Sequence, residues 1–162
     1  MQRLRSWVLC LSAFSLGAFG LAAPLANQEH PTAQAPAYSS VKYEEIKWEK
    51  ILPDWGDASP RIAILRVDPK TQATHLLIWN PVAMHVPRHW HTANETHTIL
   101  RGRMVFECGG NREELGPGSF NFIPSKMVHQ AWLPDDGLVM ITVDSAWDLN
   151  WVDGPPAPPK KP

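Results

Sequence analysis

Two histidines and a glutamate lie close together near the middle of the chain. His89 and His91 are separated by one residue, so on an extended strand both imidazoles leave the same face. Glu95 follows after a short polar interval, and His129 is available downstream as a fourth ligand. Imidazole nitrogens together with a carboxylate oxygen form a ligand set for a divalent transition metal. The sequence therefore predicts a metal site before any other functional feature.

A further histidine, His97, continues the alternation that begins at Glu95. Strand parity carries Glu95, His97 and Ile99 to one face, so we expect His97 to point inward beside the carboxylate. In that position it would orient Glu95 or act as a general acid or base toward a metal-bound substrate. The alternative is a half-exposed histidine of the domain without a role.

The first residues are typical of an export signal. Arg3 and Arg5 form a basic start, residues 7–21 are apolar, and the small residues Ala22 and Ala23 follow. This order predicts a signal peptide over residues 1–23 and an exported protein, periplasmic or secreted. The apolar run is too short for a comfortable membrane span, so no membrane attachment is expected after cleavage. An uncleaved N-terminal anchor is the alternative.

Charge and cysteine usage exclude several classes of partner and cross-link. The chain has 15 Lys and Arg against 16 Asp and Glu, and loss of Arg3 and Arg5 makes the mature chain slightly more acidic. No basic stripe remains, so nucleic acid and anionic membranes are not expected partners. Cys108 is the only cysteine outside the predicted signal, so the mature chain forms no internal disulfide.

Short strands separated by turns dominate the rest of the chain, and no helical period is evident. Residues 24–40 predict a disordered spacer, and the proline-rich residues 153–162 predict a mobile tail. Residues 41–152 predict a single all-β domain, a sandwich or a barrel. Strands are expected at 61–67, 74–79, 96–100, 104–107, 119–123, 128–133, 138–143 and 147–152. The side chains expected to form the apolar inner wall are Phe120, Phe122, Trp132 and Met140.

The histidine stretch resembles the first motif of the cupin superfamily. That motif has two histidines with one residue between them, a glutamate after three or four more, and a glycine after a further six. His89, His91, Glu95 and Gly102 match it. The resemblance implies a double-stranded β-helix, which is a jelly-roll barrel, over roughly residues 62–152.

The second cupin motif is matched less completely. Gly118, Pro124 and His129 stand at its intervals, whereas Lys126 replaces the usual glycine and Leu133 the usual asparagine. The metal ligand is retained, but with Lys126 in place of glycine the sequence does not determine the shape of the turn before His129.

The resemblance implies that His89, His91, Glu95 and His129 hold one divalent transition metal. Iron or manganese is favoured, while zinc, nickel, cobalt and copper also suit three imidazole nitrogens and one carboxylate oxygen. In an octahedral ion, coordination positions stay open for a small-molecule substrate or ligand. Pairing of such barrels through edge strands implies a homodimer.

Three functions are compatible with these residues. The first is a metal-dependent oxidoreductase, a dioxygenase acting on a small organic substrate, with lyase or isomerase chemistry as a variant at the same site. The second is a non-catalytic ligand- or metal-binding periplasmic protein, a sensor or scavenger. The third, a structural barrel with a vestigial site, is the weakest because all four ligands are present. An inward-facing His97 would favour the enzyme, and an outward-facing one would remove most of its support.

Overall fold

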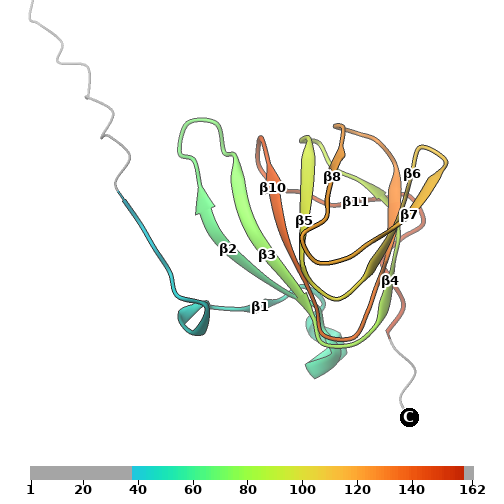
Figure 1. Ribbon diagram of the computed structural model, residues 1–162, viewed down its shortest axis with the longest axis horizontal. Coiled ribbons are helices and arrows are strands. Elements are labelled where there is room, and N and C mark those ends of the chain that lie inside the picture. Colours follow the sequence, from blue (N-terminus) through green and yellow to red (C-terminus); the bar gives the residue numbers. More distant parts are fainter. Residues whose placement is uncertain (1–37, 159–162) are drawn as a thin grey trace, which may run out of the picture. The chain divides into compact units, whose positions relative to one another are not determined.

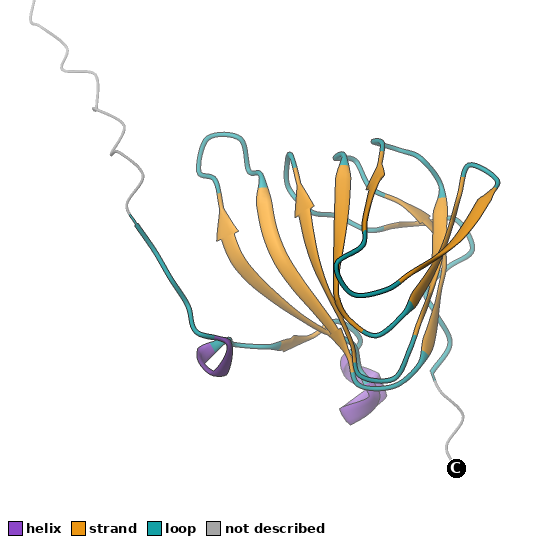
Figure 2. Cartoon of the chain, viewed as in Figure 1, coloured by secondary structure: helices purple, strands orange, loops and turns teal. Residues whose placement is uncertain are grey.

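Two antiparallel β-sheets form the part of the chain that the computed structural model describes, residues 38–158 (Figures 1 and 2). The predicted signal peptide and residues 24–37 of the predicted spacer lie outside the described residues. The larger sheet has the strand order β1 (Glu49–Lys50), β2 (Arg61–Val67), β3 (Thr74–Asn80), β10 (Gly137–Val143), β5 (Glu95–Arg101) and β8 (Phe120–Ile123). The smaller sheet has the order β11 (Asn150–Trp151), β4 (Met84–Trp90), β9 (His129–Leu133), β6 (Met104–Cys108) and β7 (Asn111–Leu115).

This architecture confirms the predicted all-β jelly-roll fold. Neighbouring strands that are distant in sequence, such as β4 with β9 and β10 with both β3 and β5, bring separate parts of the chain together. Two short 3-10 segments, η1 (Tyr43–Glu45) and η2 (Pro53–Ala58), precede β2. No helix among residues 38–158 has the length and apolar character needed to cross a membrane.

β7 escaped prediction, and the last strand was predicted too long. β7 has the sequence Asn-Arg-Glu-Glu-Leu and is mostly exposed, so it lacks the apolar alternation that marks a strand. It forms because a turn with both glycines at positive φ, Gly109 and Gly110, pairs it with β6 as a hairpin. The strand expected at 147–152 is reduced to Asn150–Trp151.

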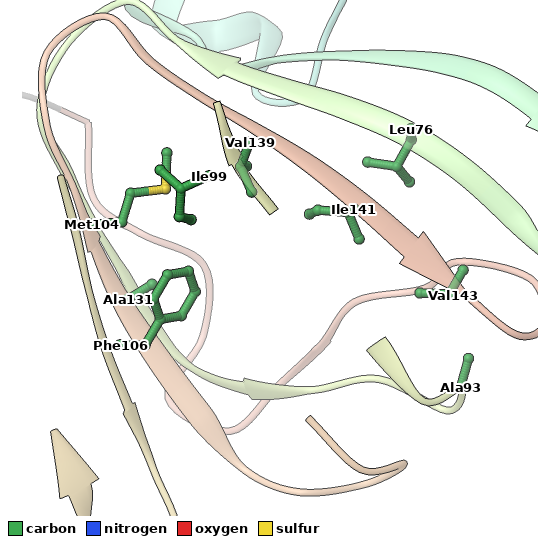
Figure 3. Packing of buried hydrophobic residues seen from close by; sticks show 9 residues of the cluster. All are labelled: Leu76, Ala93, Ile99, Met104, Phe106, Ala131, Val139, Ile141 and Val143. Atoms are coloured by element: carbon green, nitrogen blue, oxygen red, sulfur yellow. The ribbon is translucent and has the colours of Figure 1, made fainter. Parts of the chain in front are cut away.

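The core lies between the two sheets and is built from alternate residues of their strands (Figure 3). Its buried members are Leu76, Ala93, Ile99, Met104, Phe106, Ala131, Val139, Ile141 and Val143. All of them except Ala93, which lies between β4 and β5, come from strands of the two sheets. The interior is therefore a shared apolar layer, and part of it also lines the polar site described below.

The predicted inner wall was wrong by one residue of strand phase. Phe120 and Phe122 are 61% and 54% exposed, and the residue between them, Asn121, points inward instead. On β9, Ala131 is buried whereas the Trp132 ring stacks on His85. Met140 likewise lies between the buried Val139 and Ile141. Side chains alternate between the two faces of a strand, so either set of alternate residues can face the core. The large aromatic side chains made the wrong set look like the buried one.

Two turns that shape the site use left-handed backbone. Gly102 has φ 83°, and a Cβ there would lie 2.6 Å from Cγ of Pro134, so only glycine fits. Lys126 has φ 61°, the conformation that the usual glycine of the motif would adopt. Its backbone N–H donates to the carbonyl oxygen of His91 at 2.8 Å. The turn before His129 therefore adopts left-handed backbone despite the substitution.

The start of the predicted mobile tail is attached to the domain. The Arg88 guanidinium donates two hydrogen bonds of 2.7 Å to the Asp153 carboxylate, and the backbone N–H of Val152 donates to the Arg88 carbonyl. Pro156 lines a cavity described below. The proline-rich composition of the tail gave no sign of this attachment, because the partner of Asp153 lies 65 residues earlier in the chain.

Candidate metal centre

Three of the predicted ligands come together where β4 and β9 pair. His89 and His129 are direct partners in the register of these strands, and their ring centroids are 4.1 Å apart. His91 follows the end of β4, with its ring 5.1 Å from His89 and 5.2 Å from His129. One nitrogen of each lies within 4.8 Å of the others, and all three side chains are buried. These histidines can hold a metal ion.

The hydrogen bonds of the three rings select one tautomer. Nδ1 of His89 donates to the carbonyl oxygen of Pro87 at 2.7 Å, and Nδ1 of His129 donates to that of Met127 at 3.0 Å. Nδ1 of His91 donates to the carbonyl oxygen of Asp148. A carbonyl can only accept, so each Nδ1 carries a hydrogen and each neutral ring presents the lone pair of Nε2. Metal-ligating histidines typically have this arrangement, in which the nitrogen that does not bind the metal donates a hydrogen bond to a backbone carbonyl.

Glu95, at the start of β5, faces the three histidines from the other sheet. Its Oε2 lies 3.1 Å from Nε2 of His91 and 3.6 Å from Nε2 of His129. The residue is 1% exposed, and neither carboxylate oxygen has a well-formed hydrogen bond among the described residues. A buried carboxylate without hydrogen bonds is costly unless a cation compensates it. The orphaned oxygens and the convergent Nε2 atoms therefore fit a bound divalent cation.

His97 points inward, as strand parity predicted. It is 5% exposed, and its Nε2 lies 3.5 Å from Oε2 of Glu95. Its Nδ1 donates to Oδ1 of Asn121 at 2.8 Å, because His97 and Asn121 are register partners across β5 and β8. The Phe106 ring packs 4.8 Å from the imidazole. His97 is thus held beside the carboxylate, with its second nitrogen directed toward it.

Two residues that support the site were missed by sequence reasoning. Asn121 orients His97, but it had no usable sequence signal, because the phenylalanines on either side of it favoured the opposite strand phase. Asp148 binds His91 through its carbonyl, and its carboxylate accepts from the backbone N–H and the hydroxyl of Thr92. The 57 residues between Asp148 and His91 left no local signal for this contact.

Burial and mutual proximity control protonation at this site. Burial, followed by the neighbouring His129, lowers the pKa of His89 to about 3, and burial lowers the pKa of His129 to about 4. Burial also opposes the charged forms of His91 and Glu95, but the neighbouring groups outweigh it. The Glu95 carboxylate raises the pKa of His91, while His97 first and His91 next lower the pKa of Glu95 to about 2.

The metal-free protein is expected to lose stability in mild acid. An unfolded histidine takes up its proton near pH 6.5, whereas folded His89 and His129 resist protonation until about pH 3 and 4. Between pH 6.5 and the lower pKa values of the folded state, the unfolded chain binds more protons than the folded chain. The free energy of unfolding therefore falls as the pH falls. The raised pKa of His91 offsets only part of this loss. We expect calorimetry to show a melting temperature roughly 10 °C lower at pH 4.5 than at pH 7.5.

The matched control for this expectation is His85→Asn, which removes an exposed histidine of the same strand, β4. This variant should keep the full pH dependence. A melting temperature that stays constant from pH 7.5 to 4.5 in the metal-free protein would contradict the buried, neutral state of His89 and His129.

The centre opens on a small cavity of about 70 Å³. The three histidines, Glu95 and His97 supply its polar wall, and hydrophobic side chains supply the remainder, among them Ile78, Val86, Phe106, Leu133, Val139, Ile141 and Trp147. One polar cluster converging in an otherwise apolar cavity is the usual composition of a small-molecule site.

A jelly-roll barrel with a histidine-lined centre between its sheets defines a class of metal-binding β-barrel proteins. The family model described as "Cupin domain" matches residues 75–144, which include all five polar residues of the centre. Residues 75–144 therefore form a cupin domain. No curated protein matches the sequence.

Solved structures share this fold at low sequence identity. An RmlC-like cupin from Shewanella frigidimarina is 19% identical with a TM-score of 0.58, covering 68% of this chain and 93% of its own. A candidate acetylacetone dioxygenase from Methylibium petroleiphilum is 13% identical with a TM-score of 0.57, covering 75% and 87%. The DMSP lyase DddQ from Ruegeria pomeroyi is 19% identical with a TM-score of 0.52, covering 70% and 60%. These similarities establish the fold and do not assign an activity to this chain.

Proposed function

We propose that this protein is an exported, metal-dependent oxidoreductase of the dioxygenase type that acts on a small organic molecule. The observation that carries the proposal is His97, a buried imidazole that does not belong to the three-histidine cluster yet lines the same cavity. A protein that only sequesters a metal has no need of a further titratable group held beside the ligands. The proposal of export rests on the order of basic, apolar and small residues in residues 1–23.

The residues of the centre divide into holding and proton-handling groups. His89, His91 and His129 would hold the metal through Nε2, with Glu95 as the fourth ligand through a carboxylate oxygen. Iron or manganese is favoured, and a redox-active ion there would supply Lewis acidity and one-electron chemistry. The protein's own contribution is a fixed set of lone pairs, a preset tautomer and a small cavity whose remaining wall is apolar.

His97 is the group that can hold or move a proton. Its Nδ1–H is committed to Asn121, so Nε2 is the atom that exchanges a proton. Oε2 of Glu95, 3.5 Å away, is the nearest basic atom that the structure pairs with it. In the proposed reaction, Nε2 of His97 accepts a proton from the acidic carbon or hydroxyl of the bound substrate and returns it to the product.

The test compares one protein carrying different metals. Protein isolated from the exported fraction would be stripped of metal and reloaded with Fe(II), Mn(II) or Zn(II). Each form would then be screened with small β-diketones, phenols and 2-hydroxy acids in an oxygen electrode. We expect iron or manganese protein to consume oxygen in proportion to product, and zinc protein to consume none. Absence of the protein from the exported fraction would contradict export, and lack of turnover with every metal would favour a binding protein.

A lyase or isomerase is the second candidate, because the polar centre and His97 suit oxygen-independent proton transfer equally well. The lyase among the structural neighbours shows that this fold carries such chemistry in at least one protein. Equal turnover of zinc and iron protein under anaerobic conditions would favour this candidate over the oxidoreductase.

A further inference from the structure

A second cavity of about 80 Å³ lies beside the one at the metal centre. Hydrophobic side chains and prolines line it, and no charged residue, histidine or amide side chain does so. One wall comes from Ile51 and Leu52 before η2, and another from Leu149 and Trp151 around β11, with Pro156 from the start of the tail. Segments from both ends of the described chain thus enclose an apolar space that the core does not fill.

The two cavities share a partition. Ile78, Val86, Leu133 and Trp147 line both of them, so each of these side chains has the metal-centre cavity and the apolar cavity as neighbours. A ligand bound at the three histidines therefore needs to pass only one layer of side chains to place an apolar group in the second cavity.

Trp147 is the member of this partition whose polar atom lacks a partner. Its ring stacks on His91 at a centroid distance of 6.1 Å, but its indole Nε1 is buried and has no hydrogen-bond partner among residues 38–158. A buried donor without an acceptor destabilises the position it occupies. No polar contact anchors the ring there, so its displacement by a ligand costs no hydrogen bond and can relieve an unpaired one.

We propose that the second cavity is a subsite for the apolar tail of the substrate, whose oxygen atoms bind at the metal centre; this rests on the metal-dependent function proposed above. Each cavity alone is about half the 150 Å³ that accommodates benzene in an engineered protein cavity. The substrate class is accordingly a small oxygen chelator, such as an enol, a diketone or a hydroxy acid, with a tail of roughly three to five carbons. Unsubstituted one- and two-carbon acids would leave the subsite empty.

Straight-chain alkyl hydroxamates test this proposal without any need for turnover. They chelate through two oxygens and vary only in the tail. Their affinity for the full-length, zinc-loaded protein would be measured by titration calorimetry from acetohydroxamate to octanohydroxamate. We expect about fourfold tighter binding for each added methylene until the subsite is full, and a plateau after that, because each buried methylene contributes about 0.8 kcal/mol.

Variants at Leu149, which lines the second cavity and not the metal-centre cavity, should change this dependence in opposite directions. Leu149→Phe fills the space, so the fold-increase in affinity for each added methylene should fall toward one. The affinity for acetohydroxamate should be unchanged. Leu149→Ala enlarges the space and should move the plateau to longer tails. Leu100→Ala, at a 45% exposed leucine outside both cavities, is the matched control and should leave the series unchanged. If the Leu149→Phe variant does not fold, the wild-type series and Leu149→Ala still decide.

The outcomes separate this inference from the function on which it rests. Tight acetohydroxamate binding without any dependence on tail length would overturn the subsite and leave the metal-dependent function standing. A dependence that Leu149→Ala does not alter would place the tail elsewhere and also overturn the subsite. Metal-loaded protein that binds no hydroxamate would overturn the open metal centre, and the subsite with it.

Discussion

Replacing His91 and His129 together with alanine is expected to reduce bound metal from about one ion per chain to less than a tenth of that after dialysis. The double substitution removes two of the three Nε2 lone pairs that converge in the centre. It leaves His89 and Glu95, which are too few to hold a divalent ion against buffer. Loss of a supporting partner alone costs metal affinity about 10- to 100-fold, so loss of two ligands should cost at least a thousandfold.

The matched control removes two histidines that lie outside the cluster. His75 is half-buried on β3 and His85 is exposed on β4, and neither lines the metal-centre cavity. The His75→Ala, His85→Ala variant should keep full metal content when measured by elemental analysis of the dialysed protein. Circular dichroism would verify that both variants retain the barrel. Full metal content in the His91→Ala, His129→Ala protein would show that the ion binds elsewhere.

Motif residues within one strand segment could be placed from the sequence because their spacing carries geometric information. The alternation of His89 with His91, and of Glu95 with His97, determines which face each side chain shares once the segment is extended. All four are buried, and Glu95 and His97 approach each other as that parity requires. The match of His129 to the second motif likewise placed it with the other ligands, where it pairs with His89.

Other features depended on contacts that no local pattern encodes. The inward phase of β8 is set by its pairing with β5, and exposed phenylalanines gave a misleading hydrophobic signal. Asp148 reaches His91, and Asp153 reaches Arg88, only after the chain has returned to the barrel. The apolar second cavity needs segments from both ends of the domain, so its existence is a property of the assembled fold.

His97→Gln is expected to separate metal binding from turnover. Glutamine keeps a polar side chain of similar reach but cannot hold a proton as imidazole does. Because the three clustered histidines remain, metal content should stay near wild type. General acid or base catalysis typically contributes 10²- to 10⁴-fold, so kcat should fall by about that factor on the substrate that the oxygen-electrode screen identifies. KM should change little, because His97 is proposed to act on the proton and not on the binding of the substrate.

The pH profile and a second variant distinguish proton transfer from a purely structural role for His97. A proton-transfer role predicts that His97→Gln changes the shape of the kcat profile against pH, whereas a purely structural role lowers kcat by the same factor at every pH. Asn121→Leu removes only the acceptor that fixes the ring, so it should lower kcat by a smaller factor and keep the wild-type shape. If His97→Gln loses its metal as the ligand variant does, His97 is a ligand. If it keeps full kcat, His97 is not the group that moves the proton.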